Sequence, residues 1–145
     1  MATTVTPFLM FEGDAEEAMT FYVSLFDDAR ILEVVHFDED GPGEPGTINQ
    51  ARFELCGREY ICFDSPSEHE FGFTPSFSMF VEFEEFEEIE AVYLALSDGG
   101  QVLMPYEEYD FARRFCWLQD RFGLSWQLTL PHSEDDDEDD EEDDD

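Results

Sequence analysis

Apolar residues recur with helical spacing in two stretches of the chain, residues 15–25 and 86–96. Both stretches predict amphipathic helices that cover a sheet with one face. Asp14 precedes the first stretch and Glu17 follows three residues later, a pattern typical of an N-terminal capping box. The second is followed by the glycines of residues 97–100, which predict the end of that helix. The apolar positions are Ala15, Ala18, Met19, Tyr22, Leu25 and Phe26, then Phe86, Ile89, Val92, Tyr93 and Leu96.

Short apolar runs and alternating segments predict the strands. A tight turn at residues 56–58 and a second turn at residues 120–123 each join two of these segments, and the Gly/Pro-rich residues 38–46 predict a loop. Each half of the chain therefore has the order strand, helix and three strands. The predicted strands are residues 8–11, 30–37, 47–55, 59–63, 77–80, 101–104, 111–119 and 124–130.

The two halves resemble each other in sequence. The strand "FLMF" at residues 8–11 aligns with "FSMF" at 77–80, an offset of 69, whereas the helices align with an offset of 71. Such repetition indicates two similar supersecondary units that pack together. We therefore predict one α+β domain of residues 1–131, built from two tandem βαβββ modules at about 6–63 and 76–131, with a mixed sheet and the helices outside.

Composition changes the picture mainly through charge. The chain has 145 residues, 42% of them hydrophobic and sixteen of them Phe, enough for one core. Its formal net charge is −33, and its six basic residues are all Arg. Removing the twelve acidic residues 134–145 from that count leaves −21 on residues 1–133. Such a surface repels nucleic acid and anionic membranes, and it is typical of a halophilic protein from a salt-rich cytoplasm.

Neither the two terminal segments nor the three cysteines indicate a reactive site. Residues 132–145 are interpreted as a disordered, solubilising acidic tail rather than a docking tail, because blocks of like charge repel each other. The three cysteines form no C-x-x-C pair and are expected to be buried thiols. The first residues lack a basic segment followed by an apolar run, so we expect a cytoplasmic protein.

Three segments carry a resemblance to a known family: "TPFLMFEGDAEEAMTFYVSLF", "DSPSEHEFGFTPSFSMFV" and "WLQDRFGLSWQL". From Thr6 to Pro131 the chain resembles the PhnB-like branch of the vicinal oxygen chelate superfamily, which includes glyoxalases, extradiol dioxygenases, and bleomycin- and fosfomycin-resistance proteins. The resemblance implies that the modules form a curved cup. The branch is often labelled a demethylubiquinone methyltransferase, but the glycines of residues 41–46 lie between two predicted strands and indicate a loop, not a cofactor-binding turn.

In metal-using members of this superfamily, His or Glu side chains from the first and last strands of each module hold a divalent ion. At the matching places this chain has Pro7, residues 75–78 ("PSFS") and Gln127. Proline offers no donor atom, serine is a poor ligand, and an amide binds hard cations more weakly than a carboxylate. We therefore expect no cofactor at this site, although a divalent metal held by unconventional ligands stays an alternative.

Five residues are candidates for contacting a ligand. Gln127 and Ser125 lie on the polar face of the last strand, which is either the lining of the cup or a solvated sheet face. Trp117 suits stacking on a flat ligand or filling a core. Arg113 and its neighbour Arg114 face opposite sides of a strand, and Arg113 is the candidate for meeting an anionic ligand. His69, between two glutamates, suits proton transfer or is simply an exposed loop residue.

These observations leave three functional hypotheses. The first is a PhnB-like protein that binds a small molecule in the cup without a metal ion. The second is a lyase or dioxygenase-type enzyme that depends on a divalent metal, and the third is a non-catalytic dimeric scaffold. Whether the protein is an enzyme stays open, because no nucleophile can be identified. We expect a homodimer, since such cups expose apolar sheet and edge strands.

Overall fold

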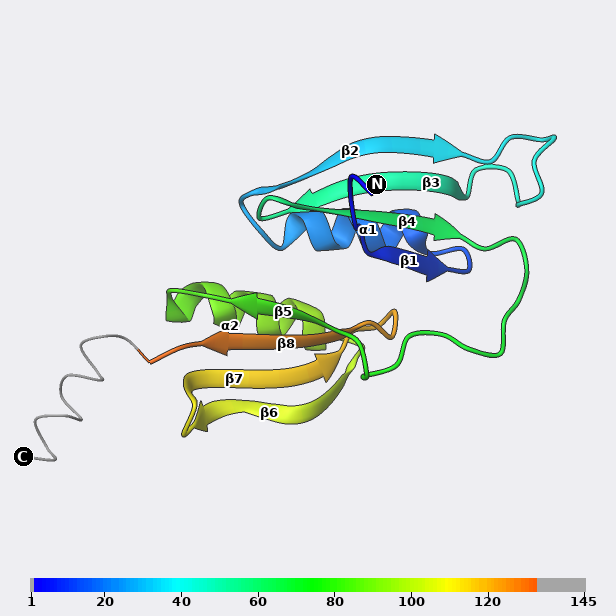
Figure 1. Cartoon of the computed structure of the whole chain (residues 1–145). Helices are drawn as coiled ribbons and strands as arrows, with labels where there is room; N and C mark the ends of the chain where they lie inside the picture. The colour runs from blue at the N-terminus through cyan, green and yellow to red at the C-terminus, as the bar shows by residue number, and fades with distance from the viewer. Residues whose placement is uncertain (1, 133–145) are drawn as a thin grey trace, which may run out of the picture. The chain divides into compact units, whose positions relative to one another are not determined.

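Each predicted helix lies along one face of a four-stranded sheet in the computed structural model (Figure 1). The structure describes residues 2–132. Among them, the residues up to Gly72 form one compact unit, called unit 1, and those from Phe73 form the other, called unit 2. The predicted acidic tail, apart from His132, lies outside the described residues.

Unit 1 is a βαβββ module. Its sheet has the strand order β1-β4-β3-β2, in which β1 pairs parallel to β4 and the other pairs are antiparallel. The β3–β4 hairpin turns at Cys56 and Gly57, which both have positive φ, the conformation that a two-residue turn of type I′ requires. Its elements are β1 (Phe8–Phe11), α1 (Ala15–Ser24), β2 (Ala29–His36), β3 (Ile48–Leu55) and β4 (Arg58–Asp64).

The core of unit 1 lies between α1 and the sheet. One face of the helix is buried there, as the helical spacing predicts. The opposing strand residues alternate between buried and exposed, because successive strand side chains point to opposite faces. The buried hydrophobic residues are Ala15, Ala18, Met19 and Tyr22 of the helix, with Leu9, Phe11, Ile48, Ala51, Phe53, Leu55 and Cys62 of the strands.

Asp14 occupies the N-cap position of α1, but its side chain makes no capping hydrogen bond, so the predicted capping box is wrong. The buried Asp64 replaces it: its Oδ1 accepts hydrogen bonds from the backbone N–H of Gly13 (2.7 Å) and Ala15 (2.9 Å). Its Oδ2 accepts one from the N–H of Ile48 (2.9 Å). Asp64 thus joins the start of the helix to the start of β3.

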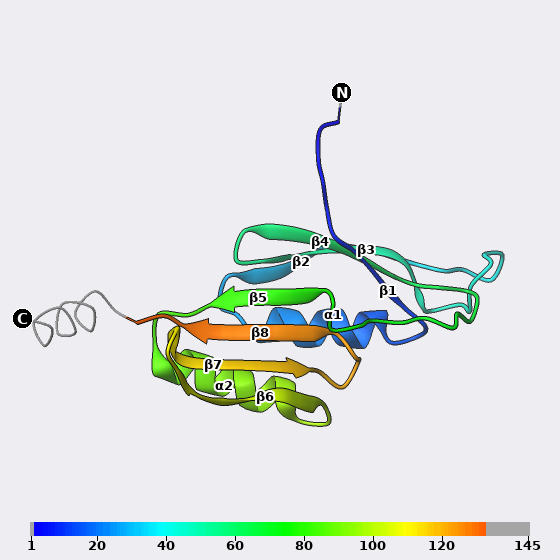
Figure 2. The same ribbon diagram turned by 60° about the horizontal axis from the view of Figure 1, so that its bottom comes forward.

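Unit 2 repeats the arrangement. Its sheet has the order β5-β8-β7-β6, with β5 parallel to β8 and the other pairs antiparallel. Figure 2 shows α2 along one face of this sheet. The helix ends at Ser97, and Gly99 follows with φ of 78°, so the predicted glycine stop is confirmed. The elements are β5 (Ser78–Glu82), α2 (Phe86–Ser97), β6 (Gln101–Tyr109), β7 (Ala112–Gln119) and β8 (Ser125–Leu130).

The predicted offset of 69 between the first strands of the two modules is wrong. It aligns Phe11 with Phe80, yet Phe11 is 6% exposed and Phe80 is 61% exposed. In the structure Leu9 and Met79 both point into the core, which requires an even offset. A slip of one residue moves every side chain of a strand to the other face, so the correction moves Phe80 away from the core.

Strand β6 runs five residues beyond its predicted end at residue 104. Pro105, which signals a strand end, lies within it because β6 is an edge strand of the sheet, where a missing N–H is tolerated. The predicted α+β fold of two βαβββ modules with mixed sheets is confirmed. No helix within residues 2–132 is long and apolar enough to cross a membrane.

Candidate functional site

The far face of unit 2, meaning the face of its sheet opposite α2, carries polar and aromatic side chains in three rows. Strand pairing sets the rows, since paired residues point to the same side of a sheet. The first row is uncharged and polar, the second places an amide between aromatic side chains, and the third ends in carboxylates. In the order β5, β8, β7, β6, the rows are Ser78, Ser125, Gln119 and Gln101; Phe80, Gln127, Trp117 and Met104; and Glu82, Thr129, Phe115 and Glu107.

A chain of hydrogen bonds links four residues of this face. The Oγ atoms of Ser78 and Ser125 are 2.6 Å apart, and the indole Nε1 of Trp117 donates to Ser125 Oγ at 2.8 Å. Gln127 Nε2 donates a long hydrogen bond to Ser78 Oγ at 3.5 Å. Ser125 is fully buried, while Trp117 and Gln127 are half-buried. Three of the five predicted contact residues, Gln127, Trp117 and Ser125, therefore lie together, and this is not a fully solvated sheet face.

Sequence reasoning missed Phe80 and Ser78 as members of the site. The offset of 69 aligns Phe80 with Phe11, which is buried, whereas Phe80 is exposed and pairs with Gln127 in the second row. Ser78 was considered only as a poor metal ligand. Regular alternation from the buried Met79 would have placed both residues on the far face.

A buried carboxylate on the opposite side fixes the strand that carries Gln127. Asp120 Oδ2 accepts a hydrogen bond from the indole Nε1 of Trp126 at 2.9 Å. Its Oδ1 accepts from the backbone N–H of Phe122 (2.8 Å) and Leu124 (3.1 Å). The turn into β8 is thus braced from within, which holds the neighbouring Ser125 and Gln127 in register.

The remaining two candidates, Arg113 and His69, lie away from this network. The first of them is held by contacts of its own, together with its neighbour Arg114. Arg113 Nε donates to the carbonyl oxygen of Pro131 at 2.9 Å, and its guanidinium carbon is 5.3 Å from the ring centre of Phe86. The guanidinium of Arg114 approaches the same ring at 5.1 Å. Both cations are therefore held near the start of α2, a contact that could not be predicted from sequence because Phe86 is distant along the chain.

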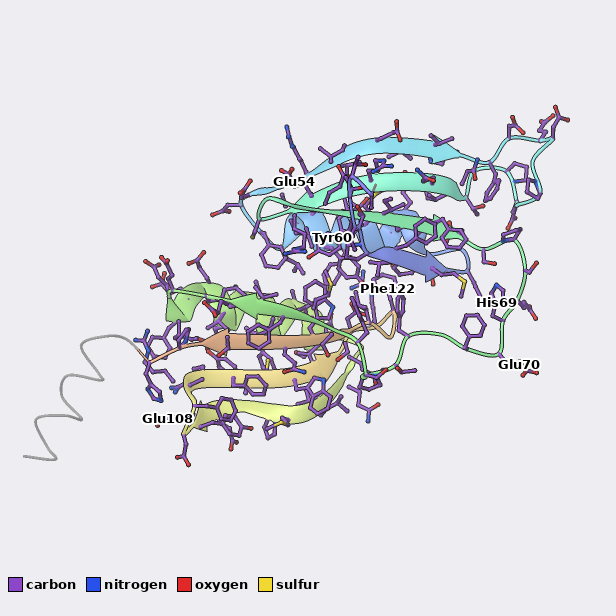
Figure 3. The ribbon with its side chains drawn as sticks, viewed as in Figure 1. Glu54, Tyr60, His69, Glu70, Glu108 and Phe122 are labelled. Atoms are coloured by element: carbon purple, nitrogen blue, oxygen red, sulfur yellow. The ribbon has the colours of Figure 1, made fainter. Side chains whose placement is uncertain are left out.

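His69 lies on the segment that follows β4, beside Glu70 (Figure 3), and belongs to unit 1. Its Nε2 is 2.9 Å from Ser65 Oγ, and its ring stacks on Phe71 at 4.9 Å. The Ser65 hydroxyl also donates to the carbonyl oxygen of Ser67 at 3.0 Å, so it stabilises a local turn. The imidazole is exposed and is not part of the far face of unit 2.

The corresponding face of unit 1 has a different chemistry, because its charges are paired. Arg52 lies 2.6 Å from Glu59 and 3.9 Å from Glu33, and Arg30 lies 3.5 Å from Glu54, which Figure 3 labels. Three carboxylates and two guanidinium groups thus neutralise one another across β2, β3 and β4. Within residues 2–132, by contrast, the three rows of unit 2 form no ion pair.

The two buried thiols, Cys62 and Cys116, are poor nucleophiles. Burial raises the pKa of Cys62 to about 12, and burial likewise raises the pKa of Cys116 to about 12. Both stay protonated near neutral pH and act as small apolar side chains. Cys56 is exposed, so the prediction that all three thiols are buried is wrong for this residue, which occupies the β3–β4 turn.

The comparisons with known proteins agree with this architecture. The model of the family described as 3-demethylubiquinone-9 3-methyltransferase matches residues 3–129. The chain belongs to this family. No curated protein matches it. A solved structure described as a putative 3-demethylubiquinone-9 3-methyltransferase, PhnB protein, from Bacillus cereus is 50% identical to the chain. That match has a TM-score of 0.86 and covers 88% of this chain and 99% of the other.

More distant solved structures share the fold of this chain. A glyoxylase/bleomycin resistance protein/dioxygenase domain from Frankia is 12% identical, with a TM-score of 0.63, and the match covers 92% of this chain and 95% of the other. The fosfomycin resistance protein FosX from Mesorhizobium loti is 12% identical, with a TM-score of 0.57 and coverage of 91% and 95%. The predicted resemblance to the PhnB-like branch is therefore confirmed by the family model and the Bacillus cereus structure, and the two distant structures share its fold.

The far face of unit 2 does not fit a conventional divalent metal site. The donors that converge near Gln127 are two serine hydroxyls, one amide and an indole, and an indole N–H cannot bind a cation. Residues 2–132 contain no cluster of three or more His, Cys, Asp or Glu side chains arranged to hold a metal. The centre of that face therefore presents neutral hydrogen-bonding groups and aromatic rings.

Proposed function

We propose that the far face of unit 2 binds a small planar molecule by hydrogen bonding and aromatic stacking, without a metal ion. The observation that carries this proposal is the second row, in which the amide of Gln127 lies between Phe80 and Trp117. Ligand sites typically combine aromatic walls with a few polar groups that fix orientation. A flat ring stacked on either aromatic side chain would bring its polar substituent to the amide.

The hydrogen-bond network supports this function because it orients the polar groups in advance. The indole N–H of Trp117 is already used by Ser125, which holds the ring in one position over the sheet. Gln127 donates its one hydrogen bond to Ser78 at a long distance, and within residues 2–132 its Oε1 accepts none. An amide with unused capacity beside a fixed aromatic ring can bind a ligand at little cost in side-chain entropy.

Methyl transfer, the reaction in the family's description, is not the function that this geometry supports best. A doubly wound methyltransferase binds its cofactor at a glycine-rich turn that leads from a strand into a helix. Here the glycines of residues 41–46 join β2 to β3, and Gly43 packs against the ring of Phe37. That loop has a packing role within unit 1.

The proposal is tested with 2-naphthalenemethanol, a flat neutral probe with one hydroxyl, by saturation-transfer NMR in KCl solution containing EDTA. We expect binding, and we expect Gln127→Ala to raise its Kd roughly fivefold to tenfold, the effect of losing one hydrogen bond of about 1–1.5 kcal/mol. Gln50→Ala is the matched control, because Gln50 is a half-buried glutamine on a strand of unit 1. Its Kd should equal that of the unchanged protein.

Three results would contradict the proposal, and two of them favour a different hypothesis. Binding that disappears in EDTA and returns with Mn²⁺ or Zn²⁺ would favour the metal-dependent enzyme. Lack of binding at millimolar probe would favour the non-catalytic scaffold. Equal effects of Gln127→Ala and Gln50→Ala would show that the probe binds elsewhere.

A further inference from the structure

We infer that the ligand of the far face of unit 2 carries a positive charge beside its planar ring; this inference rests on the proposed binding function. The proposed function specifies a flat ligand that forms hydrogen bonds, and this inference adds the sign of the ligand's charge. Three observations carry it: the carboxylates that flank the aromatic row, the position of the nearest arginines, and the indole of Trp117, on which no other described ring or guanidinium stacks.

The third row of the far face ends in a carboxylate on each side. Glu82 pairs with Thr129 on one edge, and Glu107 pairs with Phe115 on the other. Since adjacent strands lie about 4.8 Å apart and successive residues on one face about 6.6 Å apart, the Cα of each glutamate is roughly 8 Å from the Cα of Gln127 or Trp117. Both side chains are exposed, and no ion pair among residues 2–132 involves either of them.

The arginines closest along the sequence do not neutralise these carboxylates. The side chain of Arg113 starts on the same face of β7 as Trp117, but its guanidinium turns to Phe86 and its Nε bonds to Pro131. Unit 1 shows the opposite arrangement, in which Arg30 and Arg52 pair with the glutamates of their sheet. The three rows of unit 2 contain two carboxylates and no cation, so an anionic ligand would be repelled and a cationic one attracted.

The indole of Trp117 supplies the specific contact for a cation. Tryptophan is the best of the aromatic side chains for cation–π interaction. Among residues 2–132 no aromatic ring stacks on Trp117 and no guanidinium lies over it, whereas Phe86 and Phe122 are both approached by arginines. An ammonium group on a stacked ligand would meet the indole on one side and Glu82 or Glu107 on the other.

The experiment compares three probes with one ring and different charges: 2-naphthylmethylamine, 2-naphthalenemethanol and 2-naphthoate. It uses the lowest KCl concentration at which circular dichroism shows the full chain folded. We expect the amine to bind about fivefold more tightly than the alcohol, from two carboxylates at roughly 8 Å in water, and the naphthoate to bind most weakly. Glu82→Gln with Glu107→Gln should reduce the amine's affinity to that of the alcohol and leave the alcohol unchanged.

Glu87→Gln with Glu88→Gln is the matched control, because it removes the same charge from the first turn of α2 in the same unit. This control variant should still bind the amine more tightly than the alcohol. An amine and an alcohol that bind equally, both weakened by Gln127→Ala, would overturn the charge inference and leave the binding function standing. The charge inference would also be overturned if both double variants still bound the amine more tightly than the alcohol. Tightest binding of the naphthoate would overturn it as well. Probes that bind insensitively to Gln127→Ala would refute the binding function itself.

Discussion

Asp64 shows how one side chain can organise a module. Its carboxylate is 3% exposed and accepts three backbone hydrogen bonds, from Gly13, Ala15 and Ile48. These donors include the N–H groups at the start of α1, which have no partner within the helix and lie at the positive end of its dipole. A negative charge brought from the end of β4 therefore does the work of a local N-cap.

Replacing Asp64 by Asn tests this role. The amide keeps one acceptor oxygen but turns an NH₂ group toward backbone donors, so we expect Asp64→Asn to lower the free energy of unfolding by about 2–3 kcal/mol. Asp14→Asn is the control, because Asp14 lies at the N-cap without a capping hydrogen bond; it should change stability by less than about 0.5 kcal/mol. Urea unfolding followed by circular dichroism at one KCl concentration measures both. If Asp14→Asn lowered the free energy of unfolding more than Asp64→Asn does, the prediction of a capping box at Asp14 would be supported after all.

Some residues of the candidate site can be predicted from the sequence and others cannot, and the reason differs from residue to residue. Gln127 and Ser125 follow from alternation in a strand whose apolar residues are unambiguous, including the fully buried Trp126. Phe80 does not, because each face of "FSMF" carries one Phe and the alignment of repeats was off by one residue. The final direction of Arg113 could not be predicted, since long flexible side chains choose partners, here Phe86, that are only brought near by the fold.

At the scale of elements, the hydrophobic pattern predicted both helices well and the edge strand β6 poorly. Both helices begin at their predicted residues, because their apolar stripes are regular and acidic residues occupy the first turns. Strand β6 was predicted too short because it is irregular: its pairing with β7 shifts register three times, and it contains Pro105. The edge position that permits such irregularity is a property of the assembled sheet and is not visible in one segment.

The connection from α2 to β6 provides a test of tight packing between elements. A Cβ at Gly100 would overlap the carbonyl oxygen of Gln119, and backbone atoms cannot move aside as a flexible side chain can. We expect Gly100→Ala to lower the free energy of unfolding by about 3 kcal/mol, the upper part of the range for overpacking. Gly72→Ala is the control, since no heavy atom lies within 4 Å of its added Cβ, and its stability should be unchanged or slightly raised. Thermal unfolding measures both; equal melting temperatures would show that the connection adjusts.

For the whole molecule, the repeated module explains why fold was easier to predict than function. Two copies of one pattern constrain the topology twice, and each copy folds around its own core. The two sheet faces opposite the helices then differ: one pairs its charges, and the other presents neutral polar groups with unpaired carboxylates. The predicted homodimer stays a prediction, and the exposed Ile31, Leu32 and Val35 on the edge strand β2 are the apolar surface that supports it.

The net charge of the protein predicts that its stability depends on salt concentration. Residues 1–133 carry a formal charge of −21, so carboxylate repulsion opposes folding wherever it is not screened. Screening lengths fall from about 10 Å at 0.1 M salt to about 3 Å at 1 M, and we expect the free energy of unfolding to rise by roughly 3 kcal/mol between 0.2 and 2 M KCl. Urea titrations at several KCl concentrations measure it.

A chain ending at residue 133 is the decisive comparison, because it loses the twelve terminal acidic residues and keeps the charge of both modules. If the repulsion lies on the modules, the shortened chain should retain most of the KCl dependence, with a smaller slope. A shortened chain whose stability no longer responds to KCl would assign the repulsion to the terminal run instead. A full chain equally stable at both KCl concentrations would mean that the carboxylates are too far apart to oppose folding, and the interpretation of the composition as halophilic would fail.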